Sequence, residues 1–181
     1  MKRAIVTPAA LAAGALTELK DWLGITTPAD DTQLTALLRM ALEACEDFTG
    51  IMPLVQDCEE LLAVATGWQA LGPQPVQAIT EVLGIPAEGA RFTLPADNYE
   101  IELDHNGGGR VLVRNPGAAG RIAVRFTAGL APDWNALPDA LRHGVVRLAA
   151  HHYRERESEP SSLPPAAVAA MWRPWRRLRL A

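Results

Sequence analysis

The spacing of apolar residues changes twice along this chain, and this change restricts the fold more than any other feature. In residues 16–50, apolar side chains recur every three or four positions, the spacing of helices with one buried face. From about Val55 to Gly129 short apolar–polar alternation replaces it, interrupted by Pro, Gly, Asn and Asp, which is typical of strands joined by turns. Helical spacing returns after Leu137. We therefore expect an α+β protein: a small helical bundle with an inserted antiparallel β unit and an extended C-terminal tail.

The predicted helices have recognisable ends. A short helix over residues 16–23 stops at Gly24. A second helix starts either at a capping Thr27 followed by a proline, or a turn later at Asp30, and it ends at Gly50. A third opens at Leu137-Pro-Asp, and a fourth spans residues 166–172. Two of them carry clear buried stripes, formed by Leu34, Leu37, Leu38, Ala41, Cys45 and Phe48, and by Leu141, Val145, Leu148, Ala149 and His152.

Six segments between the helices have the character of strands. The Asn106–Gly109 sequence, with three glycines that accept positive φ, is the best hairpin turn among them. The pattern does not identify which strands lie at an edge. The predicted strands are Gln56–Ala65, Val76–Leu83, Arg91–Leu94, Tyr99–Leu103, Arg110–Arg114 and Arg121–Phe126.

These elements divide the chain into four parts. Residues 1–54 hold the first helices of the bundle, and residues 55–135 form the inserted β unit. Residues 136–159 form the long C-terminal helix of the bundle, and residues 160–181 a linker, a short helix and a tail.

Composition narrows the class of protein further. A chain of 181 residues is long enough to bury about 70% of its unfolded surface. The two cysteines are expected to be reduced and at least partly buried. A secretory signal is disfavoured because Pro8 and Gly14 break the N-terminal segment, and no apolar run approaches the roughly 20 residues of a transmembrane helix.

Charge is distributed unevenly. Residues 1–60 carry ten acids and four bases, whereas residues 138–181 carry four acids and eight bases. Complementary surfaces between copies or partners would suit this pattern, and simple unevenness of surface charge is an equal alternative.

The last ten residues hold four arginines, two tryptophans and no acid. These residue types dominate interaction hot spots, so the segment is a candidate docking tail. Its alternatives are a tail that packs on its own domain, or one that binds DNA phosphates or a membrane surface. The candidate docking residues are Trp172, Arg173, Trp175, Arg176, Arg177 and Arg179.

Signals for catalysis or cofactors are weak. His151 and Glu155 share a helix face, but zinc needs three or four ligands and the sequence places no third nearby. Asp104-His105 has no motif-placed nucleophile, and the adjacent glycines lack the lysine of a phosphate loop. We expect no enzyme activity, no metal and no cofactor.

Several segments form a recognisable pattern, in order along nearly the whole chain. The first are Leu19-Lys-Asp-Trp-Leu and Asp30-Asp, ahead of a helix ending in Glu46-Asp-Phe-Thr-Gly. The others are Pro75-Val-Gln-Ala-Ile-Thr-Glu-Val, Tyr99, Arg125-Phe-Thr-Ala-Gly, Leu137-Pro-Asp-Ala-Leu-Arg, Ala149-Ala-His-His-Tyr-Arg-Glu-Arg-Glu and Leu163-Pro-Pro, followed by the arginine-rich end. Together these segments resemble the head–tail connector (adaptor) proteins of tailed phages and gene transfer agents.

This resemblance implies a structural adaptor. Its copies, often twelve, would form a ring under the portal protein, through which DNA passes without specific binding. The ring would link the portal to a neck or tail-completion (stopper) protein, assembling in the bacterial cytoplasm and then lying in the particle neck. No membrane is implied.

Two surfaces are candidates for contacts within the ring, since ring closure joins two different faces of one chain. They are an acidic group, Glu43, Glu46 and Asp47, and a basic group, Arg154 and Arg156. Two other functions remain open: a neck or tail-completion protein adjacent to the adaptor, and a small DNA-binding regulator that uses the arginine tail.

Overall fold

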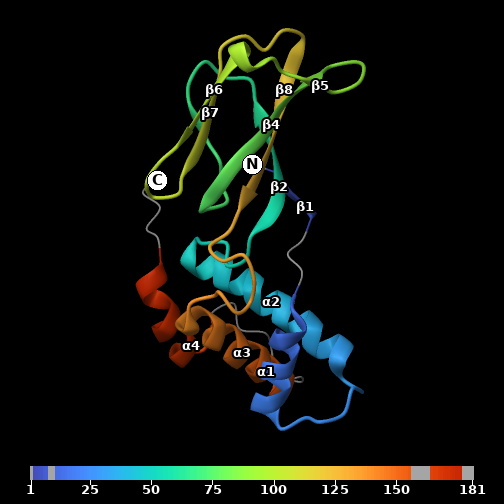
Figure 1. The fold of residues 1–181 in the computed structure, drawn as a ribbon, viewed down its shortest axis with the longest axis vertical. Helices are drawn as coiled ribbons and strands as arrows, with labels where there is room; N and C mark the ends of the chain where they lie inside the picture. The colour runs from blue at the N-terminus through green and yellow to red at the C-terminus, as the bar shows by residue number, and fades with distance from the viewer. Residues whose placement is uncertain (1, 8–10, 156–163, 177–181) are drawn as a thin grey trace. The chain divides into compact units, whose positions relative to one another are not determined.

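The computed structural model describes residues 2–7, 11–155 and 164–176. The chain forms two compact units (Figure 1). The β unit contains Met1–Ala9 and Val55–Leu130, and the helical unit contains Ala10–Leu54 and Ala131–Ala181. Mixed helices and antiparallel sheets confirm the α+β class predicted from the sequence.

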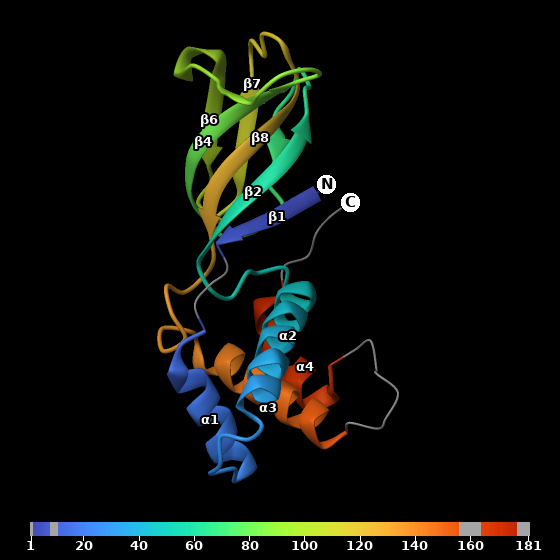
Figure 2. The same cartoon turned by 90° about the vertical axis from the view of Figure 1, so that its right-hand side faces the viewer.

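The helical unit is built around α3, which packs against α1, α2 and α4. Figure 2 shows α2 in front of α3 and α1 beside them. Gly24 and Gly50 adopt φ values of 73° and 71° and end α1 and α2, as the sequence predicts, because a left-handed cap favours glycine. The helices are α1 (Ala13–Leu23), α2 (Asp31–Thr49), α3 (Asp139–Arg154) and α4 (Ala166–Trp172), followed by the 3₁₀ turn η2 (Arg173–Trp175).

Of the two starts considered for α2, the later one is correct. The helix begins at Asp31, and Asp30 occupies the N-cap position without a side-chain capping bond. Its carboxylate instead accepts a hydrogen bond of 2.5 Å from the Tyr153 hydroxyl near the end of α3. Lys20 of α1 pairs with Asp31 at 2.7 Å. Tertiary partners therefore fix the start of α2, and the Thr27 cap is not used.

The β unit contains two antiparallel sheets. A five-stranded sheet has the order β1-β2-β8-β4-β5, and a three-stranded sheet has the order β3-β7-β6. β6 and β7 are the hairpin predicted around the Asn106–Gly109 turn. The strands are β1 (Lys2–Thr7), β2 (Gln56–Ala63), β3 (Gln69–Ala70), β4 (Val76–Pro86), β5 (Phe92–Thr93), β6 (Tyr99–Leu103), β7 (Gly109–Val113) and β8 (Ala119–Ala128), with the 3₁₀ turn η1 (Ala96–Asn98) before β6.

Alternation along the central strands separates a core face from a charged face. Cys58 and Leu62 of β2 are buried, whereas Glu59 lies opposite Arg125 of β8, which in turn lies opposite Glu81 of β4. Arg125 bonds to both carboxylates, at 3.0 and 2.9 Å. Desolvation alone would raise the pKa of Glu59, but hydrogen bonds from Arg91 and Arg125 outweigh it and lower that pKa.

Glu60 is the exception on the core face. It is 1% exposed, and its carboxylate accepts a hydrogen bond of 2.9 Å from the backbone N–H of Gly72. A buried carboxylate is tolerated only where such partners replace water, so Glu60 holds the segment after β3 against the core.

Within the β unit, the structure differs from the prediction in its set of strands and in its C-terminal boundary. Residues 2–7 form β1 on the edge of the larger sheet, and Gln69–Ala70 form β3; neither strand was predicted. The chain also enters the helical unit at Ala131, before the expected boundary at 135. Trp134 explains this second difference, because it is 1% exposed and its indole N–H donates to Glu18 of α1 at 3.0 Å.

Candidate docking surfaces

The prediction that Trp172 is a docking anchor is wrong. We expected a docking anchor, but its side chain is 0% exposed and lies inside the helical unit. The indole packs on Gly144 of α3 and on the Phe48 ring of α2. The centroids of the Trp172 and Phe48 rings lie 6.0 Å apart. The indole N–H donates a hydrogen bond of 3.4 Å to the Leu141 carbonyl. A buried side chain is not available to a partner. Trp172 therefore attaches the start of the tail to its own domain, the alternative weighed from the sequence.

The next residues are more accessible. Arg173 and Arg176 are exposed and Trp175 is half-buried. The Arg176 guanidinium lies 5.6 Å from the centre of the Phe48 ring, a cation–π geometry that leaves its outer face to solvent. Arg177 and Arg179 lie outside the described residues. The surface presented by the tail thus begins at Arg173.

The acidic group lies on the second half of α2. Glu43 and Asp47 are exposed and Glu46 is half-buried. Met40, 39% exposed, precedes them by one turn, so Met40, Glu43 and Asp47 share one side of the helix. No cation among the described residues forms an ion pair with Glu43 or Asp47.

The basic group is only partly described. Arg154 is exposed at the end of α3, and Arg156 lies outside the described residues. Arg154 borders a surface hollow of about 260 Å³ within the helical unit. Its lining comes from α1, from the second half of α3 and from the start of α4: Trp22, Arg147, Ala150, His151, Arg154, Glu155, Pro165, Ala167 and Val168.

Trp22 forms one wall of this hollow and is 42% exposed. Arg147 lies 5.9 Å from the centre of its ring, and His143 meets the ring edge-on at 5.3 Å. His151 pairs with Glu155 at 3.0 Å. Among the described residues of the lining, Glu155 is the one carboxylate, and His151 pairs with it. The described lining therefore presents two guanidinium groups, an indole face and an apolar wall.

Trp22 and Arg147 were not predicted as surface residues, although the sequence contains a signal for them. The apolar stripe of α1 runs through Leu16, Leu19 and Leu23, and Trp22 lies beside it. An aromatic residue beside a complete stripe is a candidate for an exposed contact. Arg147 lies one turn before His151 on the same face of α3.

The histidines show no metal site. No three His, Cys, Asp or Glu side chains gather closely enough for one within residues 2–7, 11–155 and 164–176. His152 is half-buried, and burial lowers its pKa from 6.5, assisted by the neighbouring His151.

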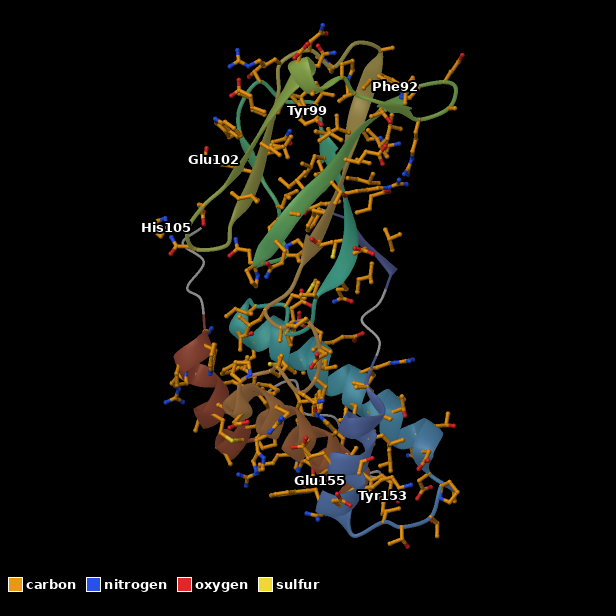
Figure 3. All side chains as sticks on the ribbon, viewed as in Figure 1. Phe92, Tyr99, Glu102, His105, Tyr153 and Glu155 are labelled. Carbon is orange, nitrogen blue, oxygen red and sulfur yellow. The ribbon has the colours of Figure 1, made fainter. Side chains whose placement is uncertain are left out.

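The Asp104–Gly109 segment makes a turn. Asp104 accepts hydrogen bonds of 2.8 Å from the backbone N–H groups of Asn106 and Gly108. The bond from Gly108 has the larger effect, and both bonds lower the pKa of the Asp104 carboxyl. Figure 3 places His105 at the tip of this hairpin. The carboxylate therefore shapes the turn between β6 and β7.

Cys45 and Cys58 are buried thiols, as expected, and neither is in a disulfide. Burial raises the pKa of the Cys45 thiol to about 12. None of the helices in the described ranges is long and apolar enough to span a bilayer.

Comparison with known proteins gives two findings. Residues 14–85, which span nearly all of α1, the whole of α2, β2 and β3, and nearly all of β4, match the family described as phage gp6-like head–tail connector proteins. No curated protein matches the chain.

The second finding comes from solved structures. A chain in the neck of an empty gene transfer agent particle, computed with C6 symmetry, aligns with a TM-score of 0.78. Chains from a native neck computed with C12 symmetry and from a native virion align at 0.76 and 0.75. In each case the identity is 27%, and the alignment covers 100% of this chain and 98% of the other. A family match over the first helices and strands, joined to a full-length match of fold, supports a head–tail connector (adaptor) role for this chain.

Proposed function

We propose that this connector is the adaptor in the neck of a phage-like particle, where about twelve copies form a ring under the portal protein. The observation that carries the proposal is the alignment over the whole chain with neck proteins of gene transfer agents, one of them in a neck computed with C12 symmetry. The ring joins the portal to the next neck or tail-completion (stopper) protein, and DNA passes through it. Copies assemble in the bacterial cytoplasm before they enter the neck.

The chemistry of the surface supports a structural role. The net charge is −4, which disfavours a wall that grips DNA. The groups tested above as catalytic or metal-binding candidates are engaged in a turn and an ion pair. We infer that the chain catalyses no reaction and acts by holding its neighbours.

In this proposal the tail docks on the portal. Arg173 and Arg176, with Arg177 and Arg179 beyond, would pair with acidic side chains of the portal, and Trp175 would add apolar contact area. Trp172 has a different task, because its buried ring fixes the point from which the tail leaves the helical unit.

The test compares binding of purified variants to the portal protein of the same particle. Removing residues 177–181, or reversing Arg173 and Arg176 to Glu, should weaken binding by at least about tenfold, as expected when like charges replace an ion pair. Arg39→Glu is the matched control, since Arg39 is exposed on α2. Imaging should locate the chain as a ring between portal and tail. A complete neck without this chain would refute the proposal.

The arginine tail also supports a second candidate function, that of a small DNA-binding regulator. Four arginines on four phosphates give a log–log salt slope of about −3.6. If the chain bound duplex DNA tightly at physiological salt, and removal of residues 177–181 abolished that binding but left portal binding intact, the regulator would replace the adaptor.

A further inference from the structure

Two surfaces of the helical unit have complementary chemistry. The first is the side of α2 that carries Met40, Glu43 and Asp47, here called the α2 knob. The second is the hollow bordered by Trp22, Arg147 and Arg154, here called the α3 hollow. The knob offers a thioether and two carboxylates, and the hollow offers an indole face and two guanidinium groups.

The two surfaces point in different directions on one copy. Leu34, Leu38, Ala41 and Cys45 form the buried stripe of α2, the helix that packs on α3. The knob residues lie outside that stripe, so they face away from α3. The hollow lies on α3 itself, where α1 and α4 flank it. A copy therefore carries a knob on one side and a hollow on another, the arrangement that a head-to-tail ring requires.

Building on the ring proposed above, we propose that the α2 knob of one copy docks in the α3 hollow of the next copy. A second copy of this chain is the one occupant to which the proposal commits. Among the described residues, the knob carboxylates and the hollow's two guanidinium groups make no ion pairs within their own chain. Both sets of charges thus remain for an intermolecular contact.

Spacing along the helices is compatible with this contact. Glu43 and Asp47 are one turn apart, about 6 Å along the axis, and Arg147 and Arg154 are two turns apart, about 10.5 Å. The long arginine side chains can close this difference. Met40, one turn before Glu43, would then reach the Trp22 ring, since sulfur and aromatic groups make favourable contacts.

Charge reversal tests the contact in assembled necks of particles that carry the full chain. Two variants are needed: Glu43→Lys with Asp47→Lys, and Arg147→Glu with Arg154→Glu. Each pair of changes should reduce the fraction of necks with a closed ring by at least about tenfold, because like charges then face each other. Combining all four changes should restore the ring, since the charges are complementary again. Loss without restoration would overturn the proposal.

Cross-linking gives an independent measurement. The native cysteines are buried, so a variant with Met40→Cys and Arg154→Cys places the two accessible thiols on the two surfaces. A short bis-maleimide should convert necks into a ladder of oligomers beyond the dimer, which only head-to-tail contact produces. Either single-cysteine variant should give no more than dimers. A ladder that fails to form in rings that imaging shows to be closed would overturn the contact.

These outcomes separate the contact from the ring. If imaging shows wild-type rings and all charge-reversed variants form them equally well, the α2 knob does not dock in the α3 hollow, but the ring stands. If wild-type necks contain no ring of this chain, the proposed function fails, and the contact fails with it. Arg39→Glu, beside the knob, adds an acid and should leave ring formation intact.

Discussion

At the scale of single residues, Gly144 decides where Trp172 lies. A Cβ on Gly144 would come within 2.7 Å of the indole Cε2 atom, closer than carbon atoms approach without movement. Because Trp172 fills the space above α3, residue 144 must lack a side chain. This glycine therefore lies inside a helix for a packing reason, despite its low helix propensity.

Gly144→Ala should destabilise the protein by about 1–3 kcal/mol, the usual cost of overpacking a core. Thermal and denaturant unfolding measure this change. Gly120→Ala is the control, since nothing lies within 4 Å of a Cβ at that position. If both variants unfolded alike, the packing of Trp172 on α3 would be wrong.

His152 makes stability depend on pH. Its pKa is lowered from 6.5 by burial first and by His151 second, while Glu155 opposes the shift. The unfolded chain thus takes up this proton at a higher pH than the folded chain. The associated stability is complete above pH 6.5 and is lost as the pH falls below it.

His152→Asn should therefore lose less stability than the wild type between pH 7.5 and 5.5, as measured by urea unfolding at each pH. His105→Asn, at the exposed hairpin tip, is the comparison. If the stability of His152→Asn depended on pH as strongly as that of the wild type, groups other than His152 would cause the pH dependence.

At the scale of elements, the two faces of β2 should respond differently to substitution. Glu60→Leu leaves the Gly72 N–H without its acceptor and should cost about 1–3 kcal/mol. Glu59→Gln on the charged face weakens exposed ion pairs with Arg91 and Arg125 and should cost about 1 kcal/mol or less. Denaturant unfolding of both variants tests the assignment, and equal losses would contradict it.

At the scale of the whole molecule, the end of the chain includes Trp172, which belongs to the core of the helical unit, and the arginines that we propose dock on the portal. A chain ending at residue 176 keeps Trp172 and should unfold at the wild-type temperature. A chain ending at residue 171 loses that buried ring and should be less stable by about 3–5 kcal/mol, as for other large core truncations. Calorimetry of the two truncations decides this. Loss of portal binding by the longer one would then report on docking rather than on unfolding.

Local spacing determined much of this protein without any structure. The stripes of α2 and α3, the glycines that end α1 and α2, and the β6–β7 hairpin follow from residues within a few positions of one another. The α+β class follows from the two changes of period. The connector resemblance also depended on motifs in order along the chain, and the family match and solved necks confirm it.

Tertiary structure alone decided which surfaces are free. The sequence predicted Trp172 as a docking anchor because tryptophan and arginine dominate interface hot spots. Its side chain instead packs on Gly144, which lies far away in the sequence. β1 acquired its place by pairing with β2, some fifty residues later. The hollow at Trp22 exists because α1, α3 and α4 meet around it. Burial and strand pairing depend on residues distant in the chain, so a pattern read over a few positions indicates what an element is but not what covers it.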